Sequence, residues 1–467
     1  MKQNIDLNKR SFLRGAGVLG AAAVFSGSLN GCGAKGSGKQ ATEDFAQEAL
    51  GEVPTEGMQY RHFDNLEGVN ASLLGYGCMR WPWLTNEKGE NVALDQEEIN
   101  ALVDYAIAHG VNYFDTAPKY LKGLSEEATG IALARYPRES FYLATKLSNY
   151  AKDDSLQEGK DMLARSLKRL QTNYIDFLLC HNIATSESFS RRFIDNGLLD
   201  WLCEQRAKGV IRHLGFSFHG DVMAWRLLMS YHSKVHWDFV QIQMNYVDWE
   251  HPSEESMTSR RLYEDLAFRN IPVVIMEPLL GGGLSTLPEF LANKLKSQRP
   301  DKSLASWAFR FCGSFPQVLT VLSGMTYMDH LQDNLRTYNN FEPLTEDEFK
   351  FLDEAAKIYS SYPTVPCTAC KYCMPCPYGL DIPGIFAHYN KCVNTGQVVS
   401  SKADEGYAKA RKAFLVGYDR AVPSVRQAAH CITCGLCRTK CPQRINIPKR
   451  MQEIDAFVEK LKQGLEL

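Results

Sequence analysis

Eight short runs rich in Val, Ile, Leu and aromatic residues recur between residues 66 and 340, and helical patterns separate them. The predicted strands are 72–78, 111–115, 141–146, 174–181, 212–217, 239–244, 272–277 and 318–323. Eight strands, each followed by a helix, over about 270 residues match the size of a (β/α)8 barrel. An open doubly wound sheet is the alternative, but no strand is followed by a G-x-G-x-x-G turn. We therefore predict an α/β fold built on a TIM barrel.

The first predicted helix lies in "LDQEEINALVDYAIAHG". Asp95 is a candidate N-cap with Glu98 three residues later, and Gly110 is a stop signal. Apolar residues recur at helical spacing and would form one buried face. That face consists of Ile99, Leu102, Val103, Ala106 and Ile107. Similar helices are predicted at 156–171 and 326–338.

Polar residues end four consecutive predicted strands after apolar runs, namely Asp115, Lys146, His181 and Ser217. The active sites of such barrels lie at the carboxyl ends of the strands. Any one of these residues alone could be an ordinary residue of the barrel rim. As a set they indicate an active site at the mouth of the barrel.

The charge balance excludes one class of partner, because 52 Lys and Arg oppose 54 Asp and Glu and no nucleic-acid binding is expected. The cysteines carry more information. Eight of the 14 fall between Cys367 and Cys441, and the other six are scattered. A disulfide scaffold would spread its cysteines through a small domain, so this clustering favours a metal site.

The clustered cysteines form two copies of one unit, "CTACKYCMPCPYGLDIP" and "CITCGLCRTKCPQRINIP". Each copy has four closely spaced cysteines followed by Pro, a pattern typical of iron–sulfur clusters. Structural zinc is the alternative, although zinc ribbons rarely use four cysteines in so short a run. The intervening residues, about 380–430, read as helices, and Cys392 is predicted to be a buried residue there.

At "FDTAPKY", "LATK" and "DFLLCH" the sequence resembles the aldo-keto reductases, over residues 59 to 340. The resemblance implies a catalytic tetrad of Asp115, Tyr120, Lys146 and His181. A phenol with a pKa near 10 is a poor acid at neutral pH, so Lys146 would stabilise its anion and Asp115 would hold the ammonium. Tyr120 would then donate a proton to a carbonyl oxygen, and His181 would polarise that carbonyl. "QYRHFDNLEG" resembles the hairpin that closes the bottom of the family's barrel.

The resemblance also implies NAD(P)H, or another tightly held two-electron carrier, in the barrel. Its predicted contacts are Ser217 and Gln241 at the carboxamide, Gly281, Gly282 and Gly283 at the pyrophosphate, and Gly324 and Asn334 nearby. The glycines could equally form a mobile loop. The family pattern is broken at three places: Phe218 replaces an asparagine, Met276-Glu277-Pro278 lacks an aromatic, and no basic residue accompanies Gly324, Met325 and His330. A 2′-phosphate requires positive partners, so a preference for NADPH is doubtful.

The duplicated cysteine unit resembles bacterial-type ferredoxins, in which the fourth cysteine of each run ligates the other cluster. The resemblance implies two [4Fe–4S] clusters. One would be held by Cys367, Cys370, Cys373 and Cys441, and the other by Cys431, Cys434, Cys437 and Cys376. The two-residue gap before Cys376 departs from the usual three.

The N-terminus has the layout of an export signal: Lys9, Arg10 and Arg14 precede an Ala- and Gly-rich apolar stretch. It resembles a twin-arginine signal with Lys9 in place of the first arginine. "LNGC" resembles a lipoprotein cleavage box with Cys32 as the lipidated residue. We predict a signal at 1–32, a flexible linker at 33–58, and an exported protein that is periplasmic or anchored to the membrane by lipid only.

The barrel is predicted at 59–340, a connecting segment at 341–366 with a helix near 345–358, and a smaller, mainly helical ferredoxin-type domain at 367–467. The expected function is an oxidoreductase that interconverts a small carbonyl and an alcohol, while iron–sulfur clusters relay electrons to or from a redox protein or membrane carrier. The alternative is an electron-transfer protein whose barrel is a non-catalytic docking scaffold. Tunnelling requires proximity, so the cysteine domain is expected to contact the carboxyl ends of the strands. Loop tryptophans would either hold a ring-shaped substrate or anchor packing; they are Trp81, Trp83 and Trp249.

Overall fold

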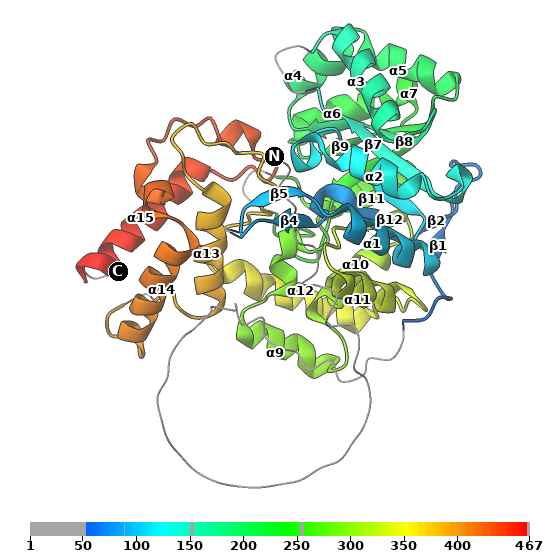
Figure 1. Cartoon of the computed structure of the whole chain (residues 1–467). Coiled ribbons are helices and arrows are strands. Elements are labelled where there is room, and N and C mark those ends of the chain that lie inside the picture. The colour runs from blue at the N-terminus through cyan, green and yellow to red at the C-terminus, as the bar shows by residue number, and fades with distance from the viewer. Residues whose placement is uncertain (1–52, 88, 150–153, 253–255, 400, 465–467) are drawn as a thin grey trace, which may run out of the picture. The chain divides into compact units, whose positions relative to one another are not determined.

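The computed structural model describes residues 53–87, 89–149, 154–252, 256–399 and 401–464 (Figure 1). Residues Val53–Leu467 form one compact unit, which holds both the strand-rich part and the cysteine-rich part of the chain. The predicted export signal, the lipidation site at Cys32 and most of the predicted linker lie outside the described residues. Their prediction therefore stays a prediction.

Eight parallel strands close into a barrel in the order β10-β11-β12-β3-β6-β7-β8-β9. The strands are β3 (Leu74–Gly77), β6 (Tyr113–Asp115), β7 (Tyr142–Leu147), β8 (Ile175–Ile183), β9 (Ile211–Phe218), β10 (Phe239–Gln243), β11 (Val273–Met276) and β12 (Val318–Ser323). Each overlaps one of the eight predicted strands, so the (β/α)8 fold is confirmed. The doubly wound alternative is wrong, because β12 pairs with β3 and closes the sheet.

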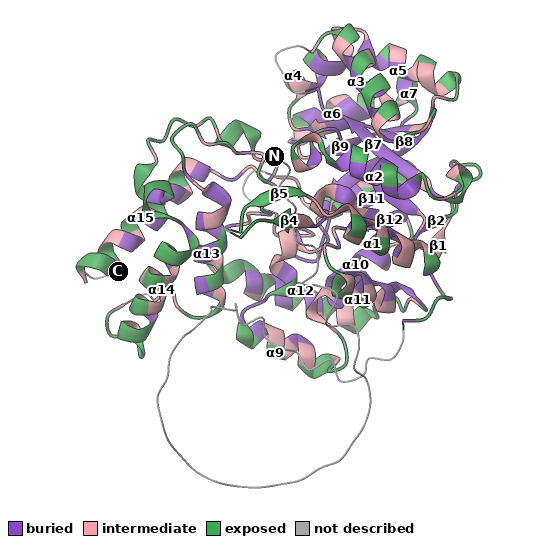
Figure 2. Cartoon of the chain, viewed as in Figure 1, coloured by how far each residue is buried: buried purple, intermediate pink, exposed green. Residues whose placement is uncertain are grey.

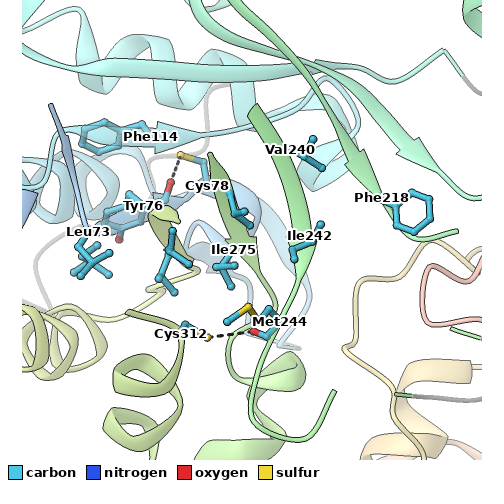
Figure 3. Packing of buried hydrophobic residues seen from close by; sticks show 14 of the residues in the cluster. Leu73, Tyr76, Cys78, Phe114, Phe218, Val240, Ile242, Met244, Ile275 and Cys312 are labelled. Carbon is cyan, nitrogen blue, oxygen red and sulfur yellow. Dashed lines mark hydrogen bonds between the residues drawn. The ribbon is translucent and has the colours of Figure 1, made fainter. Parts of the chain in front are cut away.

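Successive side chains of a strand point to opposite faces of the sheet, so the barrel has one apolar core inside it and another between its strands and the surrounding helices. Tyr113, Phe177 and Phe239 belong to a cluster inside the barrel, and all three are fully buried. A larger cluster fills the space between the strands and the surrounding helices. Figure 3 shows part of it, with Ile242 and Ile275 on neighbouring strands. Most residues of the barrel strands are buried (Figure 2), as expected for a parallel sheet covered on both faces, although Arg212 of β9 is exposed.

A short antiparallel hairpin of β1 (Tyr60–Arg61) and β2 (Ala71–Ser72) precedes the barrel. The Tyr60 hydroxyl donates to the Gly110 carbonyl, and Arg61 donates to the Gly313 carbonyl at the end of a later helix. These contacts fix the hairpin beside the amino ends of the strands. The expected hairpin at the barrel bottom is therefore present.

Helices connect the strands and cover the barrel. They are α1 (Gln96–Ala108), α2 (Ser125–Leu133), α3 (Leu156–Arg169), α4 (Ser186–Phe189), α5 (Leu198–Ala207), α6 (Val222–Ser230), α7 (His232–Val235), α8 (Ser259–Phe268), α9 (Glu289–Gln298), α10 (Leu304–Gly313) and α11 (Met328–Tyr338). The Asp95 carboxylate accepts from the Glu98 backbone N–H at 3.1 Å, so Asp95 is the N-cap of α1 as predicted.

The connecting helix α12 (Glu346–Ser361) agrees with the prediction near 345–358. It begins with a capping box in which Thr345 and Glu348 bond to each other's backbone. Glu348 also accepts from buried Arg310 of α10 at 2.9 and 3.0 Å and from Arg299 at 2.7 Å. Burial alone would raise the pKa of Glu348, but the hydrogen bonds of Arg310, the Thr345 backbone and Arg299, with the charge of Arg310, together lower it to about 2.

The cysteine-rich part contains α13 (Ile382–Asn394), α14 (Tyr407–Ala421) and α15 (Ile447–Gln463) around a separate apolar core. Phe386 and Phe414 are fully buried there, and so is Met451. Cys392 is buried in this core, as predicted. This part is mainly helical among the described residues, in agreement with the predicted fold class.

Two elements were not predicted. The hairpin of β4 (Trp83–Thr85) and β5 (Asn91–Leu94) lies between the first barrel strand and α1, and most of its residues are exposed. Exposed strands lack the apolar alternation that a sequence pattern detects. Helix α15 follows the last cysteine, where its Asn446 cap and early Pro are its start signals.

Candidate functional site

The site is built at the carboxyl ends of the strands by the alternation that fills the barrel. Phe177 and Leu179 of β8 point into the barrel, so His181, two residues further on, points into its mouth. By the same parity Tyr113 places Asp115 and Ala144 places Lys146 on the inner face. The mouth therefore receives a carboxylate, an ammonium and an imidazole from three adjacent strands.

Asp115 and Lys146 form a buried ion pair with side chains that are 3% and 1% exposed. Lys146 Nζ lies 2.5 and 2.6 Å from the two carboxylate oxygens and donates to the Thr116 carbonyl at 3.0 Å. Burial lowers the pKa of Lys146, and the Asp115 charge opposes that shift. Burial likewise raises the pKa of Asp115, and Lys146 opposes it. Each partner thus keeps the other charged, and the ammonium is fixed in one position.

Tyr120 begins the short helix η3 (Tyr120–Gly123), directly after β6. Its side chain is 8% exposed, and its ring centroid lies 5.2 Å from Lys146 Nζ and 6.0 Å from the His181 ring. The next two residues, Leu121 and Lys122, have positive φ angles of 52° and 60°. Such conformations are costly for residues with a Cβ and are found where surrounding structure imposes them. The loop therefore holds the phenol between the ammonium and the imidazole.

His181 is held from two sides. Its Nδ1 lies 2.5 Å from the Ser148 hydroxyl, and Arg192 donates to its carbonyl at 2.6 Å. Burial lowers the pKa of His181 well below its usual value, and the positive charges of Lys146 and Arg192 lower it further. The imidazole is thus neutral at neutral pH, and a neutral ring can donate a hydrogen bond from one nitrogen.

The predicted carboxamide contacts, Ser217 and Gln241, are buried and adjacent, because β9 and β10 pair at these positions. The Ser217 hydroxyl accepts from the Asn182 backbone N–H at 2.8 Å. Gln241 Oε1 and Asn182 Oδ1 are buried without a hydrogen-bond partner among the described residues. Orphaned buried acceptors are uncommon and fit a ligand that brings N–H donors. These residues fit a carboxamide.

Two of the glycines predicted to contact the pyrophosphate lie against other residues of the chain. A Cβ added to Gly281 would lie 2.3 Å from Thr368 Cα, and one on Gly283 would lie 2.9 Å from the Tyr359 hydroxyl. One on Gly324 would lie 2.9 Å from the Arg80 side chain.

The other two predicted contacts, Gly282 and Asn334, have different surroundings. Gly282 has only Ser285 Oγ nearby, at 4.0 Å. Asn334 is buried and donates to Ser323 at 2.9 Å. Thr368, Tyr359 and Arg80 lie directly against three of the glycines that were expected to contact a dinucleotide. The groove therefore does not fit that group.

Four cysteines predicted to share the first cluster line one cavity, namely Cys367, Cys370, Cys373 and Cys441. Burial, and after it the neighbouring Cys370, Cys367 and Cys441, raise the pKa of Cys373 to about 12. These thiols lie close together and would need a metal to become thiolates.

The remaining four cysteines form a second group. Burial raises the pKa of Cys437, and the nearest charges that add to the shift belong to Cys431, Cys434 and Cys376. Within the described residues, no three His, Cys, Asp or Glu side chains converge closely enough to hold a single metal ion. A cluster places its ligating sulfurs around a larger body than a single zinc ion does.

The cysteine-rich part contacts the mouth of the barrel. Gln443, two residues after Cys441, exchanges hydrogen bonds of 3.0 and 2.8 Å with Gln243 at the end of β10. Arg80, after the first barrel strand, donates to the Thr368 carbonyl at 2.7 Å. These contacts lie at the carboxyl ends of β3 and β10, as expected, and the expected nearness of the cysteines to Tyr120 and His181 stays a prediction.

Sequence reasoning missed Ser148, Asn182 and Arg192, which orient His181 and the neighbouring backbone. Ser148 follows Lys146 by two residues, so strand parity could have found it, whereas Asn182 directly follows His181 and parity assigns it to the opposite face. Trp81 is buried and donates to Thr129 Oγ1, and Trp249 stacks among aromatic rings. Both are packing anchors. In the part of the chain that the structure describes, no helix has the length and apolar content to span a membrane.

A closed (β/α)8 barrel with a buried Asp–Lys–Tyr–His group at its mouth, joined to a cysteine-rich helical module, defines an iron–sulfur oxidoreductase. The profile of the Aldo/keto reductase family matches residues 73–357, and that of the 4Fe-4S dicluster domain matches residues 366–446. The chain belongs to the aldo/keto reductase family and carries an iron–sulfur domain after the barrel.

Several known proteins resemble the barrel. "Uncharacterized oxidoreductase YqkF" of Bacillus subtilis (strain 168) is 28% identical over 327 residues, which cover 63% of this chain and 96% of that protein. "L-galactose dehydrogenase" of Arabidopsis thaliana is 25% identical over 299 residues, or 60% of this chain and 88% of that protein. The holo form of aldo-keto reductase AKR11C1 from Bacillus halodurans has a TM-score of 0.51 and 24% identity, and covers 64% and 96% of the two chains. The last comparison shows the fold alone.

Proposed function

We propose that this protein interconverts a small carbonyl and an alcohol at Tyr120, and that its iron–sulfur module relays the electrons. The observation that carries the proposal is the buried Lys146–Asp115 pair beside the Tyr120 ring, with His181 on the other side. A scaffold without chemistry would have no use for two buried charges, because burying an ion pair costs several kcal/mol.

Tyr120 is the proton donor to the carbonyl oxygen, and the acceptor in the reverse reaction. The fixed Lys146 ammonium, 5.2 Å from the ring centroid, stabilises the phenolate that forms when the proton leaves. Asp115 acts as a positioning residue, because its two hydrogen bonds determine where the ammonium lies. This arrangement lets a weak acid work at neutral pH.

His181 polarises the same carbonyl. Its Nδ1 is engaged by the Ser148 hydroxyl, so Nε2 is the nitrogen that faces a substrate. Because burial keeps the ring neutral, His181 orients the carbonyl rather than protonating it. Proton transfer and orientation are therefore assigned to different residues.

The two groups of cysteines would hold two [4Fe–4S] clusters, which supply single electrons when bound. Reduction of a carbonyl consumes two electrons and two protons, so a two-electron carrier of the nicotinamide or flavin class is needed at the mouth. Ser217 and Gln241 would hold the amide edge of such a ring. An aldo/keto reductase of the same fold from Klebsiella pneumoniae, 20% identical with a TM-score of 0.50, was solved in complex with NADP and acetate.

An export signal at the N-terminus would explain the combination. Outside the cytoplasm soluble NAD(P)H is scarce, so an exported reductase needs another supply of electrons. A periplasmic protein, soluble or tethered through a lipid on Cys32, would exchange electrons with a redox protein or a membrane carrier. The mature N-terminus, determined by mass spectrometry of the native protein, tests this localisation; retention of Met1 would contradict it.

Tyr120→Phe tests the catalytic assignment. We expect the loss of one hydroxyl to lower carbonyl turnover about 100-fold or more, while the iron content and the visible spectrum remain unchanged. Tyr105→Phe, on the helix α1, is the matched control and should retain activity. Unchanged turnover in Tyr120→Phe would contradict the proposal and favour the electron-transfer scaffold.

A further inference from the structure

We infer that the Cys367–Cys370 loop occupies the groove in which relatives would extend a dinucleotide, so that this protein binds neither NADH nor NADPH in that manner. The inference rests on the proposed function and narrows the carrier that it requires. It begins from the contact between Gly281 and Thr368. Thr368 lies between two predicted ligands of the first cluster and is 2% exposed.

The contact is tight and leaves no layer of ligand between the two backbones. Gly281 has a φ of +69°, and a Cβ there would lie 2.3 Å from Thr368 Cα and 2.7 Å from Thr368 Cβ. The backbone N–H of Gly281, which a pyrophosphate would need as a donor, instead donates to the Glu277 carboxylate at 2.8 Å. The chain thus satisfies this donor itself.

An acidic side chain, Glu277, also occupies the place where a phosphate would need positive partners, and its carboxyl accepts from the Gly281 N–H. Burial raises the pKa of the Glu277 carboxyl, and the charge of Arg80 and the hydrogen bonds of Gly281 and Thr368 oppose that shift. A carboxyl group offers a pyrophosphate no positive charge. Glu277 has a φ of 54°, so the backbone is held in an unfavourable conformation to make these contacts.

Arg80 closes the other wall of the groove. Its guanidinium donates to the Thr368 carbonyl at 2.7 Å, and its aliphatic stem lies against Gly324, where a Cβ would come within 2.9 Å. The Arg80 guanidinium is therefore committed to the cysteine loop. Thr368 is thus held in place by four surrounding residues, namely Gly281, Gly324, Glu277 and Arg80.

Unlike the pyrophosphate groove, the carboxamide end of the site still offers an acceptor to a ligand, because Gln241 Oε1 has no partner in the described part of the chain. A ring with an amide edge fits there, but the path that would carry a second nucleotide is filled by the module that brings in electrons. The carrier in the barrel is accordingly compact and is not exchanged as free NAD(P)H.

Equilibrium dialysis of the anaerobically purified full-length holoprotein against NADPH and NADH tests the inference. We expect no saturable binding up to about 1 mM, which corresponds to a binding free energy weaker than about −4 kcal/mol. Hydrogen exchange of peptides covering 277–285 and 366–373 should be unchanged by either nucleotide. Mass spectrometry of small molecules released on denaturation should detect no nicotinamide dinucleotide.

Saturable binding with a Kd below about 100 µM, new protection of either peptide, or a retained dinucleotide would overturn the inference. The proposed function would survive any of these results, since it requires only that Tyr120 act on a carbonyl. Conversely, an active Tyr120→Phe variant would contradict the proposed function but would leave the result of the nucleotide-binding measurement unaffected. The two claims therefore fail separately.

An independent observation concerns the second group of cysteines, and it points to an acidic electron-carrier protein as the redox partner. Cys434 is exposed, and its neighbours Ile432 and Leu436 are 55% and 56% exposed. Arg438 and Lys440 are exposed beside them. We name these five residues the cluster-exit face. Residues 420–452 contain seven Lys and Arg and no Asp or Glu.

An exposed ligand brings a cluster within tunnelling reach of a partner, and exposed apolar residues ringed by charge are typical of brief electron-transfer contacts. Positive charge around the face would attract a negatively charged carrier and raise its association rate.

Stopped-flow reduction of the holoprotein by an acidic plant-type ferredoxin tests the partner's charge. The rate should fall as salt rises, and the Arg438→Glu/Lys440→Glu variant should lose about tenfold at low salt. Lys409→Glu/Lys412→Glu, on exposed positions of α14, makes the same charge change elsewhere and should react like the parent. A rate independent of salt, or equal rates in the two double variants, would overturn the assignment.

Discussion

At the residue scale, the site separates the charged and neutral members of the tetrad by their surroundings. Lys146 is charged because Asp115 accepts both of its short hydrogen bonds. His181 lies near two cations, Lys146 and Arg192, which add to the lowering of its pKa by burial. Burial lowers the pKa of both basic side chains, but the Asp115 charge opposes the shift at Lys146, whereas nearby cations add to it at His181.

The pH profile of turnover follows from this difference. The pKa of His181 in the folded protein lies well below its usual 6.5, so the ring is neutral above that lowered value and gains a proton only below it. We expect kcat/KM for carbonyl reduction to show no loss between about pH 7.5 and pH 5.5 that is due to His181. An inflection near pH 6.5 that disappears in His181→Gln would contradict the assignment.

At the element scale, two connections determine how the parts of the chain are held. The first is the capping box of α12, whose Glu348 also binds Arg310 of α10. The second is η6 (Leu280–Ser285), which contacts Thr368 through Gly281. The first connection depends on the side chain of Glu348, and the second depends on the absence of a side chain at Gly281. Each joins segments that are distant in sequence.

Glu348→Ala should destabilise the protein by about 3 kcal/mol, because it leaves buried Arg310 without its carboxylate. The folded pKa of about 2 lies below the unfolded value, so this stabilisation is present above about pH 4.5 and is lost as pH falls toward 2. Urea unfolding at pH 7, with Glu346→Ala as an exposed control, measures the effect. Equal midpoints for the two variants would contradict the account.

Gly281→Ala and Gly282→Ala separate backbone strain from contact. Both glycines have positive φ, +69° and +101°, so an added Cβ strains both. Only the Cβ at Gly281 meets Thr368. We expect Gly281→Ala to lose iron more quickly to a chelator, while Gly282→Ala resembles the parent. Equal rates of iron release would show that the Gly281–Thr368 contact is unimportant.

At the scale of the whole molecule, sequence patterns predicted the barrel because its strands are rich in apolar residues and four of them end in polar ones. Those ends also indicated Asp115, Lys146 and His181 at one mouth, while Tyr120 was implied by the resemblance to the aldo-keto reductases. They could not predict the seating of Thr368 on Gly281. That contact depends on the three-dimensional path of residues 341–366, and no local pattern encodes it. The β4–β5 hairpin was missed for the opposite reason, because it buries too little to leave a pattern.

The metal content belongs to the same scale. Two groups of four cysteines predict about eight iron and about eight acid-labile sulfide per chain, with broad absorption near 400 nm. Analysis of protein purified without oxygen measures both. Stoichiometric zinc without sulfide would contradict the assignment of the cysteines.

The central claim, that the module and the barrel act as one enzyme, is tested by a single-turnover experiment. The full-length protein is reduced under anaerobic conditions, freed of reductant, and mixed with 4-nitrobenzaldehyde and with a panel of aldoses while the absorbance near 400 nm and the alcohol formed are followed. We predict that the clusters become oxidised as alcohol appears, at about two electrons per alcohol, and that Tyr120→Phe stays reduced. Clusters that stay reduced in the parent protein with every carbonyl, or alcohol formed without their oxidation, would contradict the claim.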